Sequence, residues 1–435
     1  MKKIIIFISL LITTSIFSSN LSLDDAVNKA LEYNPTQKSL HYAIQATKSN
    51  AEAQIVGYLP KISVNSTINK IKAQNSLSSN TSLNADQLLL SFSGPLQKHQ
   101  QAKNMIALSE LDKEAQANLI RLETAKTFLN AWLIQEHQSS ISSLKISAEK
   151  IFQLHRNKKK LQQLDKSTWL KNVEEYHDKL AIINAYDDNL QLAYKKLELL
   201  IGKPLSPSTH HLSWDYKKTP TLKPLEYYLQ QAVKLRPEIA RGSKKIAIEE
   251  WNVKISQGQQ LPVITANGRT GCVVTPGNAG EAFIPTQIPD IVPQPNSQGS
   301  TQQGFWSVGL TIQWSLFDGL VSQYQIQEAQ ANKLKEMLSC DQEFLDVKQQ
   351  VHDAYFQLSK ALKTLNAHKY KYLRANNDFK LMNEKLNLGK ISLVEFDTAQ
   401  TTWQEAHLAW LTQNVKVALS EHQLLHSCGY PLKQF

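Results

Sequence analysis

An internal duplication limits the fold of this chain more than any other feature of its sequence. Residues near 21–70 align without a gap with residues near 223–272, and later parts align at a slightly larger offset. Such self-similarity predicts two copies of one structural unit, at 20–220 and 221–435. The matching positions are Ala30 and Ala232, Pro35 and Pro237, Leu59-Pro60 and Leu261-Pro262, Ile62 and Ile264, Asn65 and Asn267, Phe92-Ser93-Gly94 and Phe317-Asp318-Gly319, and Ile201-Gly202 and Cys428-Gly429.

Each copy is predicted to contain a short helix, two strands, a long helix and a second short helix, so the fold class is mainly α with a smaller β part. Ser22 is a good N-cap for the first helix. Pro35 marks a fresh helix start, and Leu59-Pro60 ends the helical pattern. The expected helices are 22–58, 96–163, 167–200, 225–259, 320–387 and 392–427, and the expected strands are 61–71, 83–93, 262–273 and 305–317.

The long helical tracts contain neither glycine nor proline between 96 and 163 or between 320 and 387. Helices of this length extend roughly 100 Å, because each residue adds about 1.5 Å. Two short helices placed end to end roughly match one long helix in length. The apolar spacing is loose and alanine is frequent, which favours close coiled packing over a wide globular core.

The strand expected at 305–317 alternates an apolar face with a small and polar one, while the other strands alternate more weakly. A Ser/Asn-rich turn is expected over 74–82, followed by alternation of Leu88, Leu90 and Phe92. An apolar face with a tryptophan at each end is typical of a barrel strand that faces lipid. The alternative is a strand of an ordinary sandwich. The residues expected to face the membrane are Trp306, Val308, Leu310, Ile312 and Trp314, with Leu316 beyond them.

The N-terminus reads as a secretory signal peptide over 1–19. Lys2 and Lys3 precede the apolar run 4–12, and small residues follow at 15–19. We expect cleavage near Ser18–Asn20, and no cysteine lies there to carry a lipid anchor. No later run of eighteen apolar residues predicts a transmembrane helix.

The formal net charge is +10, a balance that is common in proteins that bind nucleic acid or anionic membrane surfaces. No basic cluster is interleaved with aromatic residues, so nucleic acid is not an expected partner. Cys272, Cys340 and Cys428 are odd in number and far apart, which does not predict a disulfide framework.

Motifs for catalysis, metal binding and phosphate binding are missing from the sequence, so we expect neither an enzyme nor a cofactor. His210-His211 stands in a Pro/Ser/Thr-rich link between the halves, and two adjacent histidines do not make a site. The rival to a membrane protein is a periplasmic coiled-coil scaffold or adaptor without a barrel. That rival accounts for the helices but not for the strand at 305–317.

Four strands per chain cannot close a membrane barrel, which needs about eight strands or more. An open sheet edge inside lipid is forbidden, because its backbone groups would have no hydrogen-bond partners. A barrel built from this chain must therefore be shared between copies, which predicts a homo-oligomer embedded in lipid.

The sequence resembles the TolC-like outer-membrane efflux proteins over nearly its whole mature length. The motifs that carry the resemblance are Leu23-x-x-Ala26 with Asn34-Pro35, Ala232 with Arg236-Pro237, the Leu-Pro pair before each first strand, 315–319 and 389–400. The resemblance implies a homotrimer with a shared twelve-stranded β-barrel and an α-helical periplasmic tunnel. It also implies a Gram-negative outer-membrane location, a periplasmic adaptor, an inner-membrane pump, and passive export of drugs, small solutes or polypeptides.

The resemblance further implies an entrance at the two turns near 158–169 and 387–396. Leu388 and Gly389 stand at the family's tip position and are candidates for docking the adaptor, although Gly389 also reads as a plain helix C-cap. Glu395 stands at an acidic aperture position, with Asp397 and Lys390 as further candidates for the gate. A solvated surface acid is the alternative for Glu395.

The first turn carries a basic run instead of a tip glycine. Lys158, Lys159 and Lys160 are hypothesised to pair with acidic residues of the adaptor or of a neighbouring chain near Glu395. A solvated face is the alternative. The insert at 273–304 is rich in proline and reads as the second extracellular loop, with a disordered surface loop as the alternative.

Overall fold

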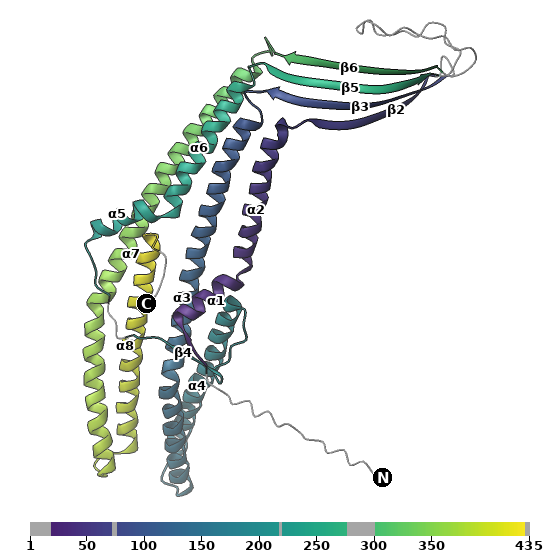
Figure 1. The fold of residues 1–435 in the computed structure, drawn as a ribbon. Helices are drawn as coiled ribbons and strands as arrows, with labels where there is room; N and C mark the ends of the chain where they lie inside the picture. Colours follow the sequence, from purple (N-terminus) through teal and green to yellow (C-terminus); the bar gives the residue numbers. More distant parts are fainter. Residues whose placement is uncertain (1–18, 72–75, 217–219, 276–300, 431–435) are drawn as a thin grey trace, which may run out of the picture. The chain divides into compact units, whose positions relative to one another are not determined.

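The computed structural model describes residues 19–71, 76–216, 220–275 and 301–430. Residues 1–18 of the expected signal peptide and most of the insert at 273–304 therefore lie outside the described residues. Figure 1 shows the elements in chain order. They are β1 (Ser19–Ser22), α1 (Leu23–Tyr33), α2 (Pro35–Ile55), η1 (Val56–Tyr58), β2 (Lys61–Ile71), β3 (Ser76–Leu90), α3 (Pro95–Lys160), α4 (Lys166–Ile201), β4 (His210–Ser213), α5 (Leu225–Leu235), α6 (Pro237–Gly258), β5 (Val263–Thr275), β6 (Thr301–Gln313), α7 (Val321–Asn387) and α8 (Leu393–Ser427).

The chain divides into two compact units. The sheet unit comprises 40–112 and 239–343, and the bundle unit comprises 1–39, 113–238 and 344–435. Both units contain segments from each half of the sequence.

The sheet unit contains one antiparallel sheet with the strand order β2-β3-β5-β6. The central pairing, β3 with β5, joins the two halves of the sequence, so β2 and β6 are the sheet edges. Ile62 lies opposite Ala85, which lies opposite Gly268, which lies opposite Val308. Because residues opposite each other share a face, Ile62 and Val308 project from the same side of the sheet.

Three details of the strands differ from the sequence expectation. Residues 76–82, expected in a turn, belong to β3, where Ser82 pairs with Asn65. The expected strand 305–317 is shifted, since β6 spans 301–313 and Trp314 follows it. A bulge between Leu88 and Leu90 turns these two residues to opposite faces, so the expected simple alternation is wrong there.

The helices of the sheet unit pack closely where α6 meets α7. A Cβ atom added to Gly242 would lie 2.4 Å from Cys340 Sγ, so a larger residue here would have to displace the Cys340 side chain. Lys245 lies 3.5 Å from carboxylate oxygens of Glu336 and Glu343 of α7. These contacts attach α6 to the N-terminal part of α7.

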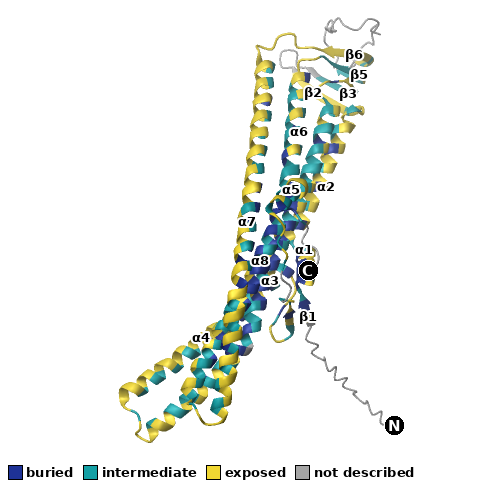
Figure 2. Cartoon of the chain, turned by 90° about the vertical axis from the view of Figure 1, so that its left-hand side faces the viewer, coloured by how far each residue is buried: buried dark blue, intermediate teal, exposed yellow. Residues whose placement is uncertain are grey.

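The bundle unit has the main apolar core. Phe128, Leu129 and Trp132 of α3 are fully or almost fully buried against residues of α4 and α8, including Leu197 and Leu411. Figure 2 shows buried residues on α3 and α8. The core lies where the segments from the two halves meet.

The parallel pair of β1 with β4 was not expected from the sequence. Gln135 of α3 extends this small sheet with its side-chain amide. Its Nε2 donates to the Leu212 carbonyl at 3.0 Å, and its Oε1 accepts from the Leu212 amide at 2.8 Å. Tyr194 also donates to Gln135 Oε1, at 2.6 Å. One glutamine thus satisfies both backbone groups of a buried strand residue.

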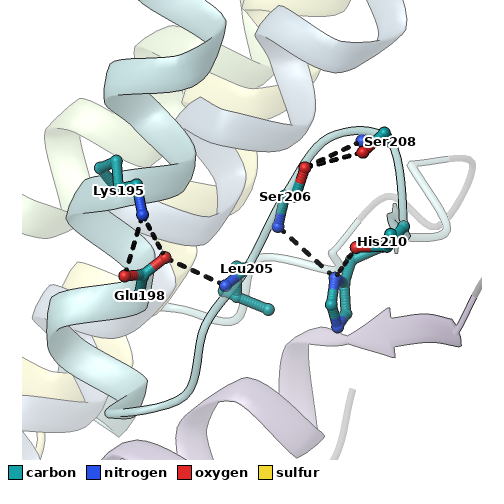
Figure 3. Close-up of polar contacts among 7 residues, drawn as sticks. Lys195, Glu198, Leu205, Ser206, Ser208 and His210 are labelled. Atoms are coloured by element: carbon teal, nitrogen blue, oxygen red, sulfur yellow. Dashed lines mark hydrogen bonds and ion pairs between the residues drawn. The ribbon is translucent and has the colours of Figure 1, made fainter.

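The link between α4 and β4 is ordered by polar contacts (Figure 3). The Glu198 carboxylate accepts from Lys195 Nζ at 2.9 Å and from the Leu205 amide at 3.0 Å. His210 Nδ1 lies 2.7 Å from Thr209 Oγ1. The histidines of the expected loop therefore belong to a structural strand and its turn.

Each of the expected short helices 22–58 and 225–259 is broken before a proline. In the second copy, Arg236 at the break is almost fully buried. Its guanidinium donates to Glu238, to the Ser427 carbonyl at 2.9 Å, and to Gln350 at 2.7 Å. The break therefore serves as an attachment point for α7 and α8.

Candidate functional sites

The turns α3–α4 and α7–α8 have the same backbone geometry. Gln162 and Gly389 both adopt positive φ, at 56° and 67°. In each turn this residue donates to the carbonyl three residues earlier, and the next residue donates to the carbonyl five residues earlier. This pattern is the Schellman motif. The sequence indicated a tip residue only at Gly389, because glutamine, the residue type at 162, rarely adopts a positive φ.

A constant offset of 227 (389 − 162) relates the two hairpins. Leu161 corresponds to Leu388, and both side chains are about two-thirds exposed, at 68% and 67%. Leu388, Gly389 and their first-half counterparts thus form two similar exposed tips. Sequence reasoning missed Leu161 because a basic run surrounds it.

The basic run occupies the last turn of α3. Lys158 and Lys160 are exposed and Lys159 is half-buried. No ion pair to them is formed within the described part of the chain. Cations at a helix C-terminus interact favourably with the helix dipole, so this run is compatible with a stable α3.

The gate candidates lie around the start of α8, where they have different environments. The Glu395 carboxylate closes a capping box, accepting from the Ser392 amide at 2.8 Å and from Ser392 Oγ at 3.0 Å. The hydrogen bond from the Ser392 amide lowers the pKa of Glu395. Lys390 is exposed in the turn. Glu395 therefore stabilises its own helix start.

Asp397 is directed toward the other hairpin. Its Oδ2 lies 2.6 Å from Lys179 Nζ of α4, and neither side chain is more than one-third exposed. Asp397 Oδ1 is buried without a hydrogen-bond partner among the described residues. This ion pair fastens the start of α8 to the first hairpin. Lys179 was not among the residues selected from sequence.

A polar seam joins α3 to α8. Gln404 Nε2 donates to the Ser140 carbonyl at 2.8 Å and to Ser143 Oγ at 3.0 Å. Gln400 Nε2 donates to Ser143 Oγ at 3.3 Å, and Ser147 Oγ donates to Gln400 Oε1 at 2.9 Å. We call this set the α3–α8 seam. Each of these hydrogen bonds contributes a modest net free energy, because water can replace either partner once the groups are exposed.

Aromatic side chains pack between the two helices of each hairpin in the same manner. Phe152 stacks on Tyr176 with ring centroids 4.1 Å apart, and it also contacts Trp169. At the offset of 227, Phe379 stacks on Trp403 at 5.0 Å and contacts Phe396.

A further contact repeats at the same offset. Tyr186 donates to the Ile134 carbonyl, and Gln413 donates to the Ala361 carbonyl. Equivalent positions thus make equivalent contacts in both hairpins.

Two histidines lie beside the α3–α8 seam. His137 of α3 is buried, and neither ring nitrogen has a hydrogen-bond partner among the described residues. Burial lowers the pKa of His137, and His407 of α8 lowers it further. Burial also lowers the pKa of His407, which contacts Tyr372. Both histidines are therefore neutral at neutral pH.

The apolar face of the sheet is strongly exposed. On β6, Val308 is 80% exposed, and the residues around it on the same face have similar values. Trp314 Nε1, just beyond the strand, donates to the Gln260 carbonyl at 3.0 Å. The exposed apolar residues of the two edge strands and the segment after β6 are Ile62, Val64, Ile68, Trp306, Val308, Leu310, Ile312, Trp314, Leu316 and Phe317.

The opposite face of the sheet carries small and polar residues. Arg269 donates to Ser82 Oγ there, with the Phe305 ring 5.4 Å from its guanidinium. No helix in the described ranges is long and apolar enough to cross a membrane. The described residues also contain no group of three or more His, Cys, Asp or Glu suited to a metal ion.

Comparisons with known proteins agree with this arrangement. Residues 228–429 match the family described as Outer membrane efflux protein. No curated protein matches the chain in sequence.

Solved structures match the fold over 94% of this chain. The CmeC outer membrane channel of Campylobacter jejuni has a TM-score of 0.72 at 16% identity, with 85% of that chain covered. The open state of the MtrE outer membrane channel of Neisseria gonorrhoeae has a TM-score of 0.71 at 16% identity, with 89% covered. The outer membrane protein VceC of Vibrio cholerae has a TM-score of 0.68 at 13% identity, with 97% covered.

Proposed function

We infer that this chain, which matches the outer membrane efflux protein family over residues 228–429 and has the fold of solved outer membrane channels, is the outer-membrane duct of a tripartite export system. The duct performs no covalent chemistry. An inner-membrane pump supplies the energy, and a periplasmic adaptor joins the pump to the duct. The exported class is drugs and small solutes or polypeptides, and the pump selects between them. The observation that carries the proposal is the exposed apolar face of the four-stranded sheet.

The sheet supports a barrel that is shared between copies. Its edges, β2 and β6, have no strand partner within the described part of the chain. A lipid-facing sheet needs every edge paired, and four strands are too few to close alone. Three copies would supply twelve strands, with β6 of one copy pairing with β2 of the next. Trp306 and Trp314 would lie at the two membrane interfaces, roughly 27 Å apart along the strand.

The hairpin turns are proposed as the periplasmic entrance. The ion pair between Lys179 and Asp397 holds the start of α8 against α4. Opening the entrance would separate these two charges and then release the α3–α8 seam, whose polar groups water can satisfy. In this proposal Asp397 holds the gate, Glu395 keeps the start of α8 helical, and Lys390 lines the exposed turn.

The two tips are proposed as the docking surface for the adaptor. Leu161 and Leu388 are exposed apolar side chains, each beside a residue with positive φ. Lys158, Lys159 and Lys160 would add attraction for acidic residues on the adaptor. Charge reversal of these three lysines to Glu should weaken adaptor binding, measured by pull-down. Charge reversal of Lys145 and Lys150, which are exposed on α3 farther from the tip, is the control. Equal binding by the two variants would overturn the role of the basic tip.

The proposed function is tested by recording currents from the purified full chain in planar lipid bilayers. A duct gives discrete channel openings. Export is tested in parallel by measuring solute accumulation in cells that lack the gene. Stable channels together with restored export support the proposal. A protein that does not enter bilayers would favour the periplasmic scaffold.

A further inference from the structure

The polar face of the four-stranded sheet carries few charged side chains. Residues that lie opposite each other on neighbouring strands share a face. One row across this face contains Ser63, Asn84, Arg269 and Ser307. Within the described strands, the charged residues that share this face are Lys61, Asp86 and Arg269. The charge of the face therefore depends on these three residues.

Two of the three charges offset each other. Lys61 and Asp86 lie directly opposite on β2 and β3, and opposite charges at paired positions attract each other. Arg269 has uncharged neighbours in its row, Asn84 and Ser307. It forms no ion pair with any residue that the structure describes. The face thus has one net positive charge per chain, and Arg269 carries it.

The guanidinium of Arg269 is directed away from Asp86. Asp86 lies opposite the residue two positions before Arg269 on β5, whereas Ser82 and Phe305 lie opposite Gly271, two positions after it. Arg269 Nη2 donates to Ser82 Oγ at 3.3 Å, and the Phe305 ring centroid lies 5.4 Å from the guanidinium carbon. The side chain therefore extends beside Gly271, where the strand has no side chain of its own, and it is exposed.

We propose that Arg269 makes the lumen of the barrel favour anions over cations. The inference rests on the proposed duct, in which the polar face lines the lumen, and it adds the ion preference of that lumen. Three copies would place three guanidinium groups at one height, and rings of charged side chains select the sign of the ions that pass. A guanidinium has five N–H donors, so the bond to Ser82 leaves others for chloride or for the carboxylate of a solute.

The contacts of Arg269 also fix the position of this charge. The ring of Phe305 packs near the guanidinium, and Ser82 is 1% exposed. An arginine that is already held in place loses less conformational freedom when it binds an anion. The charge therefore stays at one height of the lumen instead of moving with a free side chain.

Reversal potentials of the full-length protein in planar bilayers, recorded across a potassium chloride gradient, test the proposal. We expect the chloride-to-potassium permeability ratio of Arg269→Gln to fall roughly threefold at about 0.1 M salt, because charges within the Debye length of about 10 Å still act on a passing ion. Arg269→Lys keeps the charge and should keep the wild-type ratio. Lys70→Gln removes an exposed lysine from the opposite face of β2 and should also keep it.

A second variant reaches the same result without removing the arginine. Asn84→Asp is nearly isosteric and places a carboxylate directly opposite Arg269, so it should lower the ratio as Arg269→Gln does. It decides the matter alone if Arg269→Gln does not assemble.

The recordings separate this inference from the proposed duct. A lower ratio in Arg269→Gln and in Asn84→Asp, with the wild-type ratio in Lys70→Gln, would support the role of Arg269. Conducting channels with one and the same ratio in the wild type, Arg269→Gln and Asn84→Asp would overturn it and leave the duct intact. A wild-type protein that forms no channels would overturn both.

Discussion

Lys179 Nζ lies 2.6 Å from Asp397 Oδ2, so an ion pair connects the two hairpins of the chain. The lysine comes from α4 and the carboxylate from the first turns of α8. At the equivalent positions of the other hairpins stand Ala406 and Leu170, which cannot form this bond. The ion pair between Lys179 and Asp397 is therefore not repeated at the equivalent positions of the duplicated chain.

Removing the lysine should loosen the entrance. Lys179→Gln leaves the half-buried Asp397 carboxylate without its cation, which costs about 1–3 kcal/mol. We expect more frequent and larger channel openings in planar bilayers, with the trimer intact. Lys171→Gln, an exposed lysine on the same helix, is the control. Identical conductance for the two variants and the wild type would remove the ion pair from the gate.

The tip turn of the first hairpin should be stabilised by glycine. Gln162 has φ of 56°, a conformation that costs a side-chain-bearing residue about 1 kcal/mol. Gln162→Gly should therefore raise the free energy of unfolding, and Gly389→Gln should lower it by a similar amount. Denaturant unfolding followed by circular dichroism measures both. A loss of stability in Gln162→Gly would show that its side chain contributes more than the backbone strain removes.

Gln135 should be important for the small β1–β4 sheet. Gln135→Leu removes both hydrogen bonds to the Leu212 backbone and one from Tyr194. Leaving buried polar groups unsatisfied costs roughly 2–4 kcal/mol. We expect faster amide hydrogen exchange in β4 and a lower unfolding midpoint. Gln138→Leu, three residues along α3, is the control, and equal exchange in both variants would contradict the assignment.

Acid should destabilise the bundle unit. Burial lowers the pKa of His422 to about 4 and also lowers the pKa of His137, His407 and His426. The unfolded chain takes up protons at these side chains below pH about 6.5, while the folded chain does not. The contribution of these neutral histidines to the free energy of unfolding is therefore complete above pH about 6.5. For His422 it falls by about 1.4 kcal/mol per pH unit down to pH about 4.

The measurement is the unfolding midpoint as a function of pH. His422→Asn should flatten the dependence between pH 6.5 and 4 relative to the wild type. A wild-type midpoint that does not change over this interval would contradict the burial of these histidines.

The two faces of β6 should respond differently to charge. Leu310→Arg places a cation on the apolar face midway between the tryptophans, where insertion costs about 2–4 kcal/mol. We expect less protein in the outer membrane. Thr311→Arg projects from the opposite face and should assemble normally with altered ion selectivity. Equal assembly of the two variants would contradict the assignment of the lipid-facing side.

Element type and order were accessible from the sequence because the controlling signals are local. Proline at 35 and 237, the unbroken tracts after Pro95 and Gly319, and the capping residues Ser22 and Ser392 act within a few residues. Alternation along β6 likewise identified its apolar face. The resemblance to the efflux family, first indicated by short motifs, is confirmed by the family match and the fold.

Features that depend on distant partners could not be predicted. The β1–β4 pair needs Gln135, and the bulge at Leu88 depends on the register with β5. Lys179 was missed because nothing near it in sequence indicates Asp397. Glu395 was selected as a gate acid from the resemblance, but its carboxylate is directed to Ser392, which a capping-box pattern would have indicated.

The most direct test of the shared duct is the native mass of the protein extracted from isolated outer membranes in mild detergent. The account predicts three chains per particle, found in the outer-membrane fraction and separating into single chains on boiling. A single chain recovered from the soluble periplasmic fraction would contradict it.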